Sequence, residues 1–106
     1  SVQIESVAGL ENIEAIAAVE GVTQLFFGPS DYSADAGVSI DSDHTLDVAA
    51  QVAKVAKAHG LHSGSVTFTR GTPQALAKLG FSHISVAGDV AALSDSLDGS
   101  LRNAKG

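Results

Sequence analysis

The chain contains no cysteine, which excludes disulfide bonds, thiolate metal ligands and a cysteine nucleophile. It also lacks an apolar run long enough to span a membrane and the pattern of a signal peptide. Lys and Arg number six against twelve Asp and Glu, and they form no basic cluster, so no nucleic-acid surface is expected. Methionine is absent even at position 1, which suggests a piece of a longer protein. These absences are compatible with a reducing compartment, and we expect a cytoplasmic location.

The residues that are present indicate one α/β domain. Ala and Val dominate a chain of 106 residues that is 44% hydrophobic, which suits helices packed closely on parallel strands. Apolar runs and helical patterns alternate in four repeats of strand then helix. The expected strands cover residues 2–5, 23–27, 62–68 and 83–87. The expected helices cover residues 10–19, 45–59, 73–79 and 90–103. We predict a single α/β segment over residues 1–106, built from four consecutive βα units.

The two ends of the predicted sheet carry different residues. Gly21, Gly60 and Gly80 each lie between a helix and the next strand, where glycine commonly ends a helix. The connections that leave the strands carry polar groups instead: Glu5, the turn Gly28-Pro29-Ser30-Asp31, Arg70 and Asp89. In parallel α/β folds the active residues lie at the carboxyl ends of the strands, so we expect the site there.

Alternating strands and helices allow two architectures, a small open doubly wound sheet or half of an eight-stranded (β/α) barrel. An intact barrel needs about 250 residues, so this chain is close to half. The long connection 28–43 is rich in Gly, Ser and Asp, and its acidic part, 35–43, is expected to be a solvated loop rather than a second metal site. Asp89 is expected to cap the last helix. The four histidines show no metal-ligand spacing, and His59 and His62 are interpreted as surface residues.

Two carboxylates are the main candidates for chemistry. Glu5 ends the first predicted strand, and Asp31 follows the second. If these strands are neighbours, two hard oxygen ligands converge at one edge of the sheet, as in sites for a divalent cation such as Mg²⁺. Each also has a simpler interpretation, Glu5 as a solvated strand end and Asp31 as a helix cap or turn residue. Gln3 shares the face of Glu5, either as a core amide or as a substrate contact.

Several segments together resemble the HpcH/HpaI aldolase family. They are Val2-Gln3-Ile4-Glu5-Ser6, Leu10-Glu11-Asn12-Ile13, Val19-Glu20-Gly21-Val22, Phe27-Gly28-Pro29-Ser30-Asp31-Tyr32-Ser33, Gly64, and Val86-Ala87-Gly88-Asp89. The resemblance implies a (β/α)₈ TIM barrel, of which this chain is the carboxyl-terminal half. It also implies class II, metal-dependent aldolases acting on pyruvate-type 2-oxo acids, such as 4-hydroxy-2-oxoheptanedioate aldolase and 2-dehydro-3-deoxyglucarate aldolase.

The resemblance also implies roles for individual residues. Glu5 and Asp31 are the ligands of Mg²⁺, Mn²⁺ or Co²⁺, and Gln3 contacts the substrate. The backbone N–H of Ser30 binds the substrate carboxylate, within the turn that includes Gly28 and Pro29. No catalytic residue is expected in this half, because the family's enolate-stabilising Arg and His–Asp base belong to the amino-terminal half. Arg70 lies in a different segment. The expected partners are pyruvate or a related 2-oxo acid, an aldehyde, and the complementary amino-terminal half.

The lysines agree with a metal route rather than a Schiff base, because all four lie in predicted helices or in the tail. Two other functions remain open. Phe26, Phe27 and Tyr32 resemble the citrate lyase β and acyl-CoA lyase branch of the superfamily. The second alternative is a non-catalytic half-barrel that serves as an assembly module, because a lone half leaves sheet edges unpaired.

Family members commonly form hexamers in which the last helix packs on a neighbouring subunit, so a homo-oligomer is expected. Leu93, Leu97 and Leu101 form an apolar stripe that suits either this contact or packing on the chain's own barrel.

Overall fold

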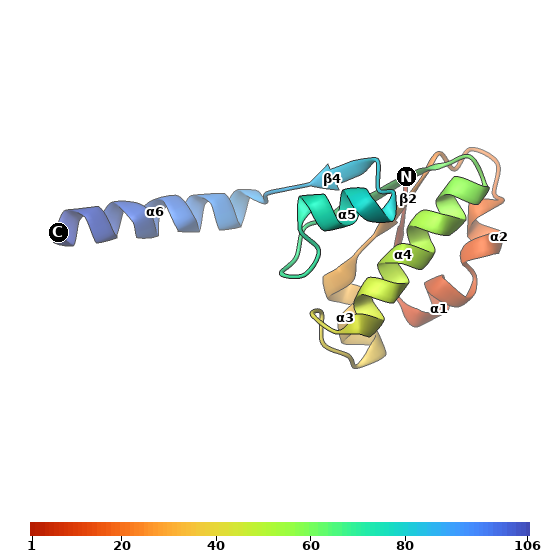
Figure 1. Ribbon diagram of the computed structural model, residues 1–106, viewed down its shortest axis with the longest axis horizontal. Coiled ribbons are helices and arrows are strands. Elements are labelled where there is room, and N and C mark those ends of the chain that lie inside the picture. The colour runs from red at the N-terminus through yellow and green to blue at the C-terminus, as the bar shows by residue number, and fades with distance from the viewer.

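The structure is a computed structural model that describes residues 1–106 as a parallel sheet covered by helices, with one long helix extending from it (Figure 1). The strands are β1 (Val2–Ile4), β2 (Gln24–Phe27), β3 (His62–Val66) and β4 (His83–Ser85). The helices are α1 (Val7–Glu11), α2 (Ile13–Ala17), α3 (Pro29–Ala36), α4 (Asp43–Ala58), α5 (Pro73–Leu79) and α6 (Asp89–Lys105). None of the six combines the length and the apolar character of a membrane-crossing helix.

The order of the strands decides between the two expected architectures. All neighbouring pairs are parallel, and the strands follow one another as β1-β2-β3-β4. A doubly wound sheet reverses its strand order part-way, whereas in a (β/α) barrel consecutive strands are neighbours and the helices form the outer layer. Helices α1 to α5 lie on one face of the sheet (Figure 1). The predicted α/β fold of four βα units is therefore confirmed as a partial TIM barrel.

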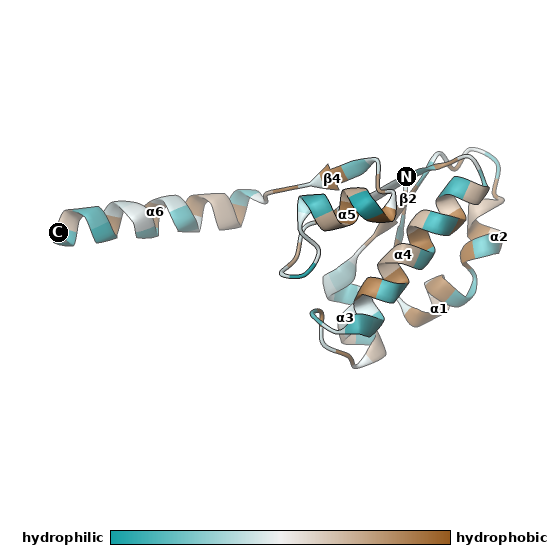
Figure 2. Cartoon of the chain, in the orientation of Figure 1, coloured by the Kyte–Doolittle hydropathy of each residue, from teal (hydrophilic) through white to brown (hydrophobic).

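The covered face of the sheet, called the outer face here, forms the core. Ile4, Leu25 and Phe27 point toward the helices and are fully buried. Helix α4 packs across β2 and β3 through small residues, including Ala49 and Val52, and apolar and hydrophilic residues alternate along it (Figure 2). Burying one Leu, Ile, Val or Phe side chain contributes about 1.5–3 kcal/mol. This face therefore accounts for most of the hydrophobic stabilisation of the chain.

The opposite face, called the inner face here, is covered by no helix. Gln3, Phe26, Gly64 and His83 occupy one row across the four strands. Gly64 has no room for a Cβ atom, because the amide of Gln24 and the ring of Phe26 lie over it. The amide of Gln24 reaches Nδ1 of His83 at 3.1 Å, and the rings of Phe26 and His83 meet edge to face with centroids 5.7 Å apart. A glycine thus lets the second and fourth strands interact across the third.

Several helix ends follow the predicted signals, most closely those of α5. Helix α5 has the predicted bounds, with Pro73 in its first turn and the hydroxyl of Thr72 accepting the N–H of Ala75 at 3.2 Å. It ends at Gly80, whose φ of 100° is the left-handed conformation that glycine adopts without strain. Gly21 and Gly60 also have positive φ, as predicted for residues between a helix and a strand.

Two predictions for the first half of the chain were wrong in detail. The expected helix 10–19 is two short helices, because Ser6 caps an earlier start and the backbone leaves the helical conformation at Asn12. The connection 28–43, expected to be a loop, contains helix α3, which begins with Pro29 and ends at Gly37 with φ of 66°. Pro at a helix start and glycine after its end were both visible in the sequence.

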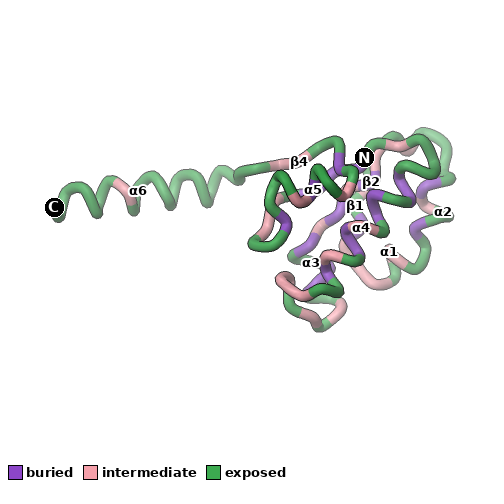
Figure 3. Tube along the Cα trace, in the orientation of Figure 1, coloured by how far each residue is buried: buried purple, intermediate pink, exposed green.

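Helix α6 extends away from the rest of the chain (Figure 1) and is exposed along nearly its whole length (Figure 3). Leu93, Leu97 and Leu101 are 63%, 56% and 58% exposed, so the apolar stripe does not pack on the chain's own sheet. Asp89 is not the N-cap that was predicted. Gly88 occupies that position, and the Asp89 carboxylate accepts the N–H of Val90 at 2.9 Å inside the first turn.

Candidate active site

The carboxyl ends of β1 and β2 bring Glu5, one predicted metal ligand, next to the turn that leads to Asp31, the other. The strands pair in register, with Ile4 beside Phe27, and the N–H of Gly28 donates to the carbonyl of Ile4 at 3.0 Å. Glu5 therefore lies next to Gly28 as the two strands leave the sheet. Asp31 follows within the first turn of α3. Both residues thus follow neighbouring strands, at the same edge of the sheet.

Gly28 leaves space at this turn rather than supplying an unusual backbone conformation. Its φ of −101° is available to any residue. A Cβ atom at this position, however, would lie 3.0 Å from Cβ and 3.4 Å from Oε2 of Glu5. The side chain of Glu5 therefore occupies the space that a larger residue at position 28 would take, and its carboxylate lies against the start of α3.

The first turn of α3 is suited to negative charge. Pro29 begins the helix, and Gly28, the N-cap, has no side chain to accept the free N–H groups of the first turn. A helix N-terminus with free N–H groups attracts anionic groups, and it also favours the exposed carboxylate of Asp31. The buried hydroxyl of Ser33 donates to the carbonyl of Pro29, and the hydroxyl of Ser65 donates to that of Phe27 at 3.1 Å. The first bond lies within α3, and the second joins β3 to the carboxyl end of β2.

A cavity of about 180 Å³ opens at this edge of the sheet. Its lining is formed by Gln3, Phe26, Gly28, Pro29, Ser30, Asp31 and Val66. Every residue that the sequence proposed for substrate contact therefore borders one space. Glu5 is not part of this lining, and its carboxylate is placed only by its contact with Gly28. A second cavity of about 350 Å³ lies beside β4 and the start of α6, and no ionisable side chain lines it.

The donor set fits a divalent cation that keeps open positions. Neither Glu5 nor Asp31 takes part in any of the chain's side-chain hydrogen bonds or ion pairs, so both carboxylates are free to bind. No group of three or more His, Asp or Glu converges anywhere in the chain. These two residues offer two hard oxygen ligands, and substrate, water or another part of the protein would have to complete the coordination of a cation bound there.

Comparison with protein families agrees with this arrangement. The model of the HpcH/HpaI aldolase/citrate lyase family matches residues 1–96. The chain belongs to the HpcH/HpaI family. Its relatives include pyruvate-type aldolases: the hydroxypyruvate/pyruvate aldolase of Paraburkholderia phytofirmans is 39% identical over 92 residues. That match covers 84% of this chain and 35% of the relative, so the chain spans about a third of its length.

Solved HpcH/HpaI structures have the same arrangement of strands and helices. A family protein from Burkholderia cenocepacia J2315 is similar to 99% of this chain with a TM-score of 0.87 and 29% identity, and the match covers 42% of that structure. A more distant structure is the citrate lyase beta subunit of M. tuberculosis, complexed with oxaloacetate and magnesium, with a TM-score of 0.66 and 19% identity over 80% of this chain. At this identity the likeness concerns the fold alone.

Sequence reasoning missed two contacts that hold α3 in place. Tyr32 is 2% exposed, its ring stacks on His44, and its hydroxyl lies 3.0 Å from Nε2 of His44 in the first turn of α4. Burial raises the pKa of Tyr32, and the nearby negative charge of Asp35 raises it further. Asp35 also accepts the N–H of Val7 at 2.8 Å, from a residue 28 positions earlier. No pattern in the sequence connects such distant residues.

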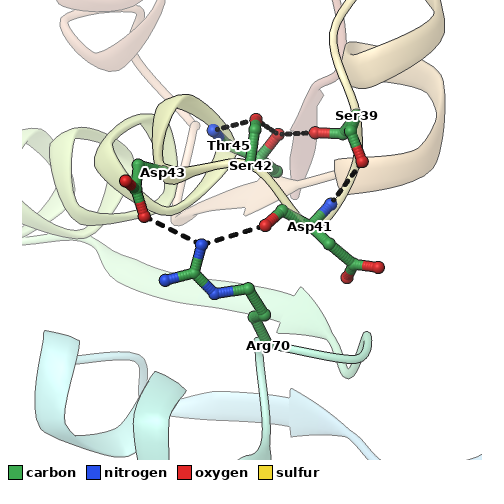
Figure 4. A network of polar contacts seen from close by, with 6 residues as sticks. All are labelled: Ser39, Asp41, Ser42, Asp43, Thr45 and Arg70. Atoms are coloured by element: carbon green, nitrogen blue, oxygen red, sulfur yellow. Dashed lines mark hydrogen bonds and ion pairs between the residues drawn. The ribbon is translucent and has the colours of Figure 1, made fainter.

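Arg70 does not lie in the cavity, in agreement with its omission from the predicted site. Its guanidinium donates to the carbonyl of Asp41 at 2.9 Å and to the carboxylate of Asp43 at 2.8 Å (Figure 4). In the same network Ser42 caps α4 by accepting the N–H of Thr45, while the carboxylate of Asp41 points away from Arg70 (Figure 4). The acidic connection before α4 is therefore joined to the loop after β3 rather than free in solvent.

Proposed function

We propose that this chain is the carboxyl-terminal half of a divalent-metal-dependent aldolase that cleaves or forms 4-hydroxy-2-oxo acids. The observation that carries the proposal is the cavity at the carboxyl edge of the sheet. It gathers Gln3 and the turn 28–31, and it lies beside the carboxylate of Glu5. Membership of the HpcH/HpaI family and likeness to a pyruvate aldolase support the same assignment.

Each residue then has a defined task. Glu5 and Asp31 would hold Mg²⁺, Mn²⁺ or Co²⁺, which when bound stabilises the negative charge that develops on the keto oxygen of a 2-oxo acid. The free N–H groups at the start of α3, including that of Ser30, receive the substrate carboxylate. Gln3 orients the substrate from β1, and Phe26 and Val66 form the apolar part of the cavity that displaces water.

The proton chemistry requires groups that this half does not supply. Forming an enolate from pyruvate removes a proton from the methyl carbon, and no histidine lines the cavity to accept it. We therefore assign the base and the enolate-stabilising Arg to a complementary amino-terminal half that packs on the inner face. An aldehyde is the second reactant. The chain alone is expected to be inactive.

Exchange of the methyl protons of pyruvate for deuterium tests this proposal without knowledge of the aldehyde. The chain assembled with its complementary half should catalyse the exchange with Mn²⁺, Mg²⁺ or Co²⁺ and stop when the metal is chelated. Glu5→Gln or Asp31→Asn should lower the rate about a hundredfold or more, the scale of losing a group that stabilises developing charge. Asp47→Asn, an exposed carboxylate on α4, is the matched control and should change little. An exchange rate of the assembled protein that is the same with and without divalent metal would contradict the proposal.

One of the residues that suggested the acyl-CoA lyase alternative does not contact the cavity in this structure. Tyr32, which suggested that branch, packs on Phe27 and His44 and does not line the cavity. The assembly of several copies remains part of the proposal. The exposed stripe on α6 is suited to a neighbouring subunit, which would make the protein a homo-oligomer, a hexamer by resemblance.

A further inference from the structure

Two hydrogen bonds connect the segment that carries Glu5 to the segment that carries Asp31. The first is the bond from the N–H of Gly28 to the carbonyl of Ile4, at the last rung of the sheet. The second is the bond from the N–H of Val7 to Oδ2 of Asp35. Between these two bonds, one side contains only Glu5 and Ser6. The other side contains residues 29–34, which form most of α3.

Asp35 is placed where it can influence the positions of both Glu5 and Asp31. It lies four residues after Asp31 on α3, so the two side chains share one face of the helix. Its bonding partner, Val7, lies two residues after Glu5. A change at this bond therefore alters how closely the connection between β1 and α1 lies to the helix face that presents Asp31.

Of the two segments that these hydrogen bonds connect, the one that contains α3 is the better anchored. Tyr32, one residue after Asp31, is buried between Phe27 and His44. Helix α1 is the weaker side: it has five residues, none of them buried, and a helix this short is not stable by itself. Its first N–H groups are satisfied by Ser6, which accepts from Gly9, and by Asp35.

From this geometry we propose that Asp35 is a positioning residue that sets the separation of Glu5 and Asp31. It neither lines the cavity nor touches the reacting atoms. It holds α1, and with it Glu5, against the helix that carries Asp31. This inference depends on the proposed function, because the separation matters only if the two carboxylates share a cation.

Metal affinity is the property that tests the inference. The assembled protein, the chain with its complementary half, is titrated with Mn²⁺ alone, and free Mn²⁺ is followed by electron paramagnetic resonance. Asp35→Ala should weaken Mn²⁺ binding by about tenfold, the low end for residues outside the ligand set. Asp35→Asn keeps an oxygen that accepts the N–H of Val7 and should bind Mn²⁺ within about threefold of the parent, well below the loss expected when such a partner is removed.

Two controls separate positioning from charge and from general destabilisation. Asp47→Ala removes an exposed carboxylate that makes no hydrogen bond, and it should leave Mn²⁺ affinity unchanged. Hydrogen exchange should show loss of protection at the Val7 amide in Asp35→Ala but not in Asp35→Asn. Thermal unfolding without metal records any loss of stability in each variant, so that affinity is compared only among folded proteins.

The outcomes distinguish this inference from the proposed function. If the parent protein does not bind Mn²⁺, the proposed function fails and the inference fails with it. If the parent binds and Asp35→Ala binds equally well while folded, only the inference is overturned. Equal weakening in Asp35→Asn and Asp35→Ala would assign the effect to lost charge, which also overturns it.

Discussion

The two faces of the sheet are made by the same four strands but carry different kinds of side chain. On the outer face Ile4, Leu25 and Phe27 are fully buried under helices that the chain itself provides. On the inner face the corresponding positions are Gln3, Phe26 and His83, and nothing in the chain covers them. The outer face is covered by helices of the chain itself, whereas the inner face is the side where we propose that the complementary half packs. Stability and function are therefore assigned to opposite sides of the sheet.

Core truncation on the outer face should have the largest effect on stability. Leu25→Ala removes a fully buried side chain and should lower the free energy of unfolding by about 2–5 kcal/mol. Gln3→Ala, on the inner face of the neighbouring strand, should change it by less than about 0.5 kcal/mol. Urea denaturation followed by circular dichroism measures both. Equal losses in the free energy of unfolding would show that the inner face contributes to stability as much as the outer face does.

A smaller loss is expected from adding one methyl group to the inner face. Gly64→Ala places a Cβ atom where the amide of Gln24 and the ring of Phe26 now lie, and overpacking of this kind costs about 1–3 kcal/mol. It should also break the contact of Gln24 with His83, visible as a changed imidazole signal in NMR spectra. Gly99→Ala, at a helical position with open space around it, is the matched control and should not be destabilising. An unchanged imidazole signal in Gly64→Ala would show that the bridge does not depend on this glycine.

Tyr32 should make the outer layer sensitive to alkaline pH. Burial and then Asp35 raise its pKa above the ordinary 10.0, so the folded state favours the protonated ring. The stability that this preference contributes to the free energy of unfolding is fully present below pH 10.0, and it is lost as the pH rises through the higher pKa of the folded state. Because the chain has one tyrosine, the phenolate absorbance reports this residue alone, and its midpoint should lie higher in the folded than in the unfolded protein.

Two substitutions at Tyr32 and its neighbour sharpen this prediction. Tyr32→Phe removes the hydrogen bond to His44 and should cost about 0.5–1.5 kcal/mol at neutral pH while abolishing the alkaline loss. Asp35→Asn should lower the midpoint of the tyrosine titration, because the neighbouring negative charge is removed. A midpoint that is equal in folded and unfolded protein would contradict the raised pKa.

The smallest effect on folding is expected at α6. Leu93→Asp with Leu97→Asp replaces exposed residues, so the free energy of unfolding of a single copy should stay within about 0.5 kcal/mol of the parent. The association of copies should weaken, because the apolar stripe is interrupted. Light scattering at several concentrations measures the change in mass. Unchanged association would assign the contact between copies to another surface.

The sequence patterns were most reliable where the signal is local. Helix α5 covers residues 73–79 and ends at Gly80, as predicted, because capping depends on residues within one turn. Helix α3 was missed although Pro29 and Gly37 mark its ends, because a composition rich in Gly, Ser and Asp outweighed these signals. The space that Gly28 leaves could not be predicted from its neighbours, because it is defined by Glu5, which follows another strand.

The sequence by itself determined the four strands, helices α4, α5 and α6, the caps of several helices, and which residues stand at the carboxyl ends of the strands. These depend on periodicity and on short-range hydrogen bonds, which neighbouring residues specify. Only the tertiary structure decided that Gly28 makes room for Glu5, that Gln24 reaches His83 across Gly64, and that Asp35 binds Val7. Each of these contacts joins residues distant in the chain, and it exists only because strand register and helix packing bring them together.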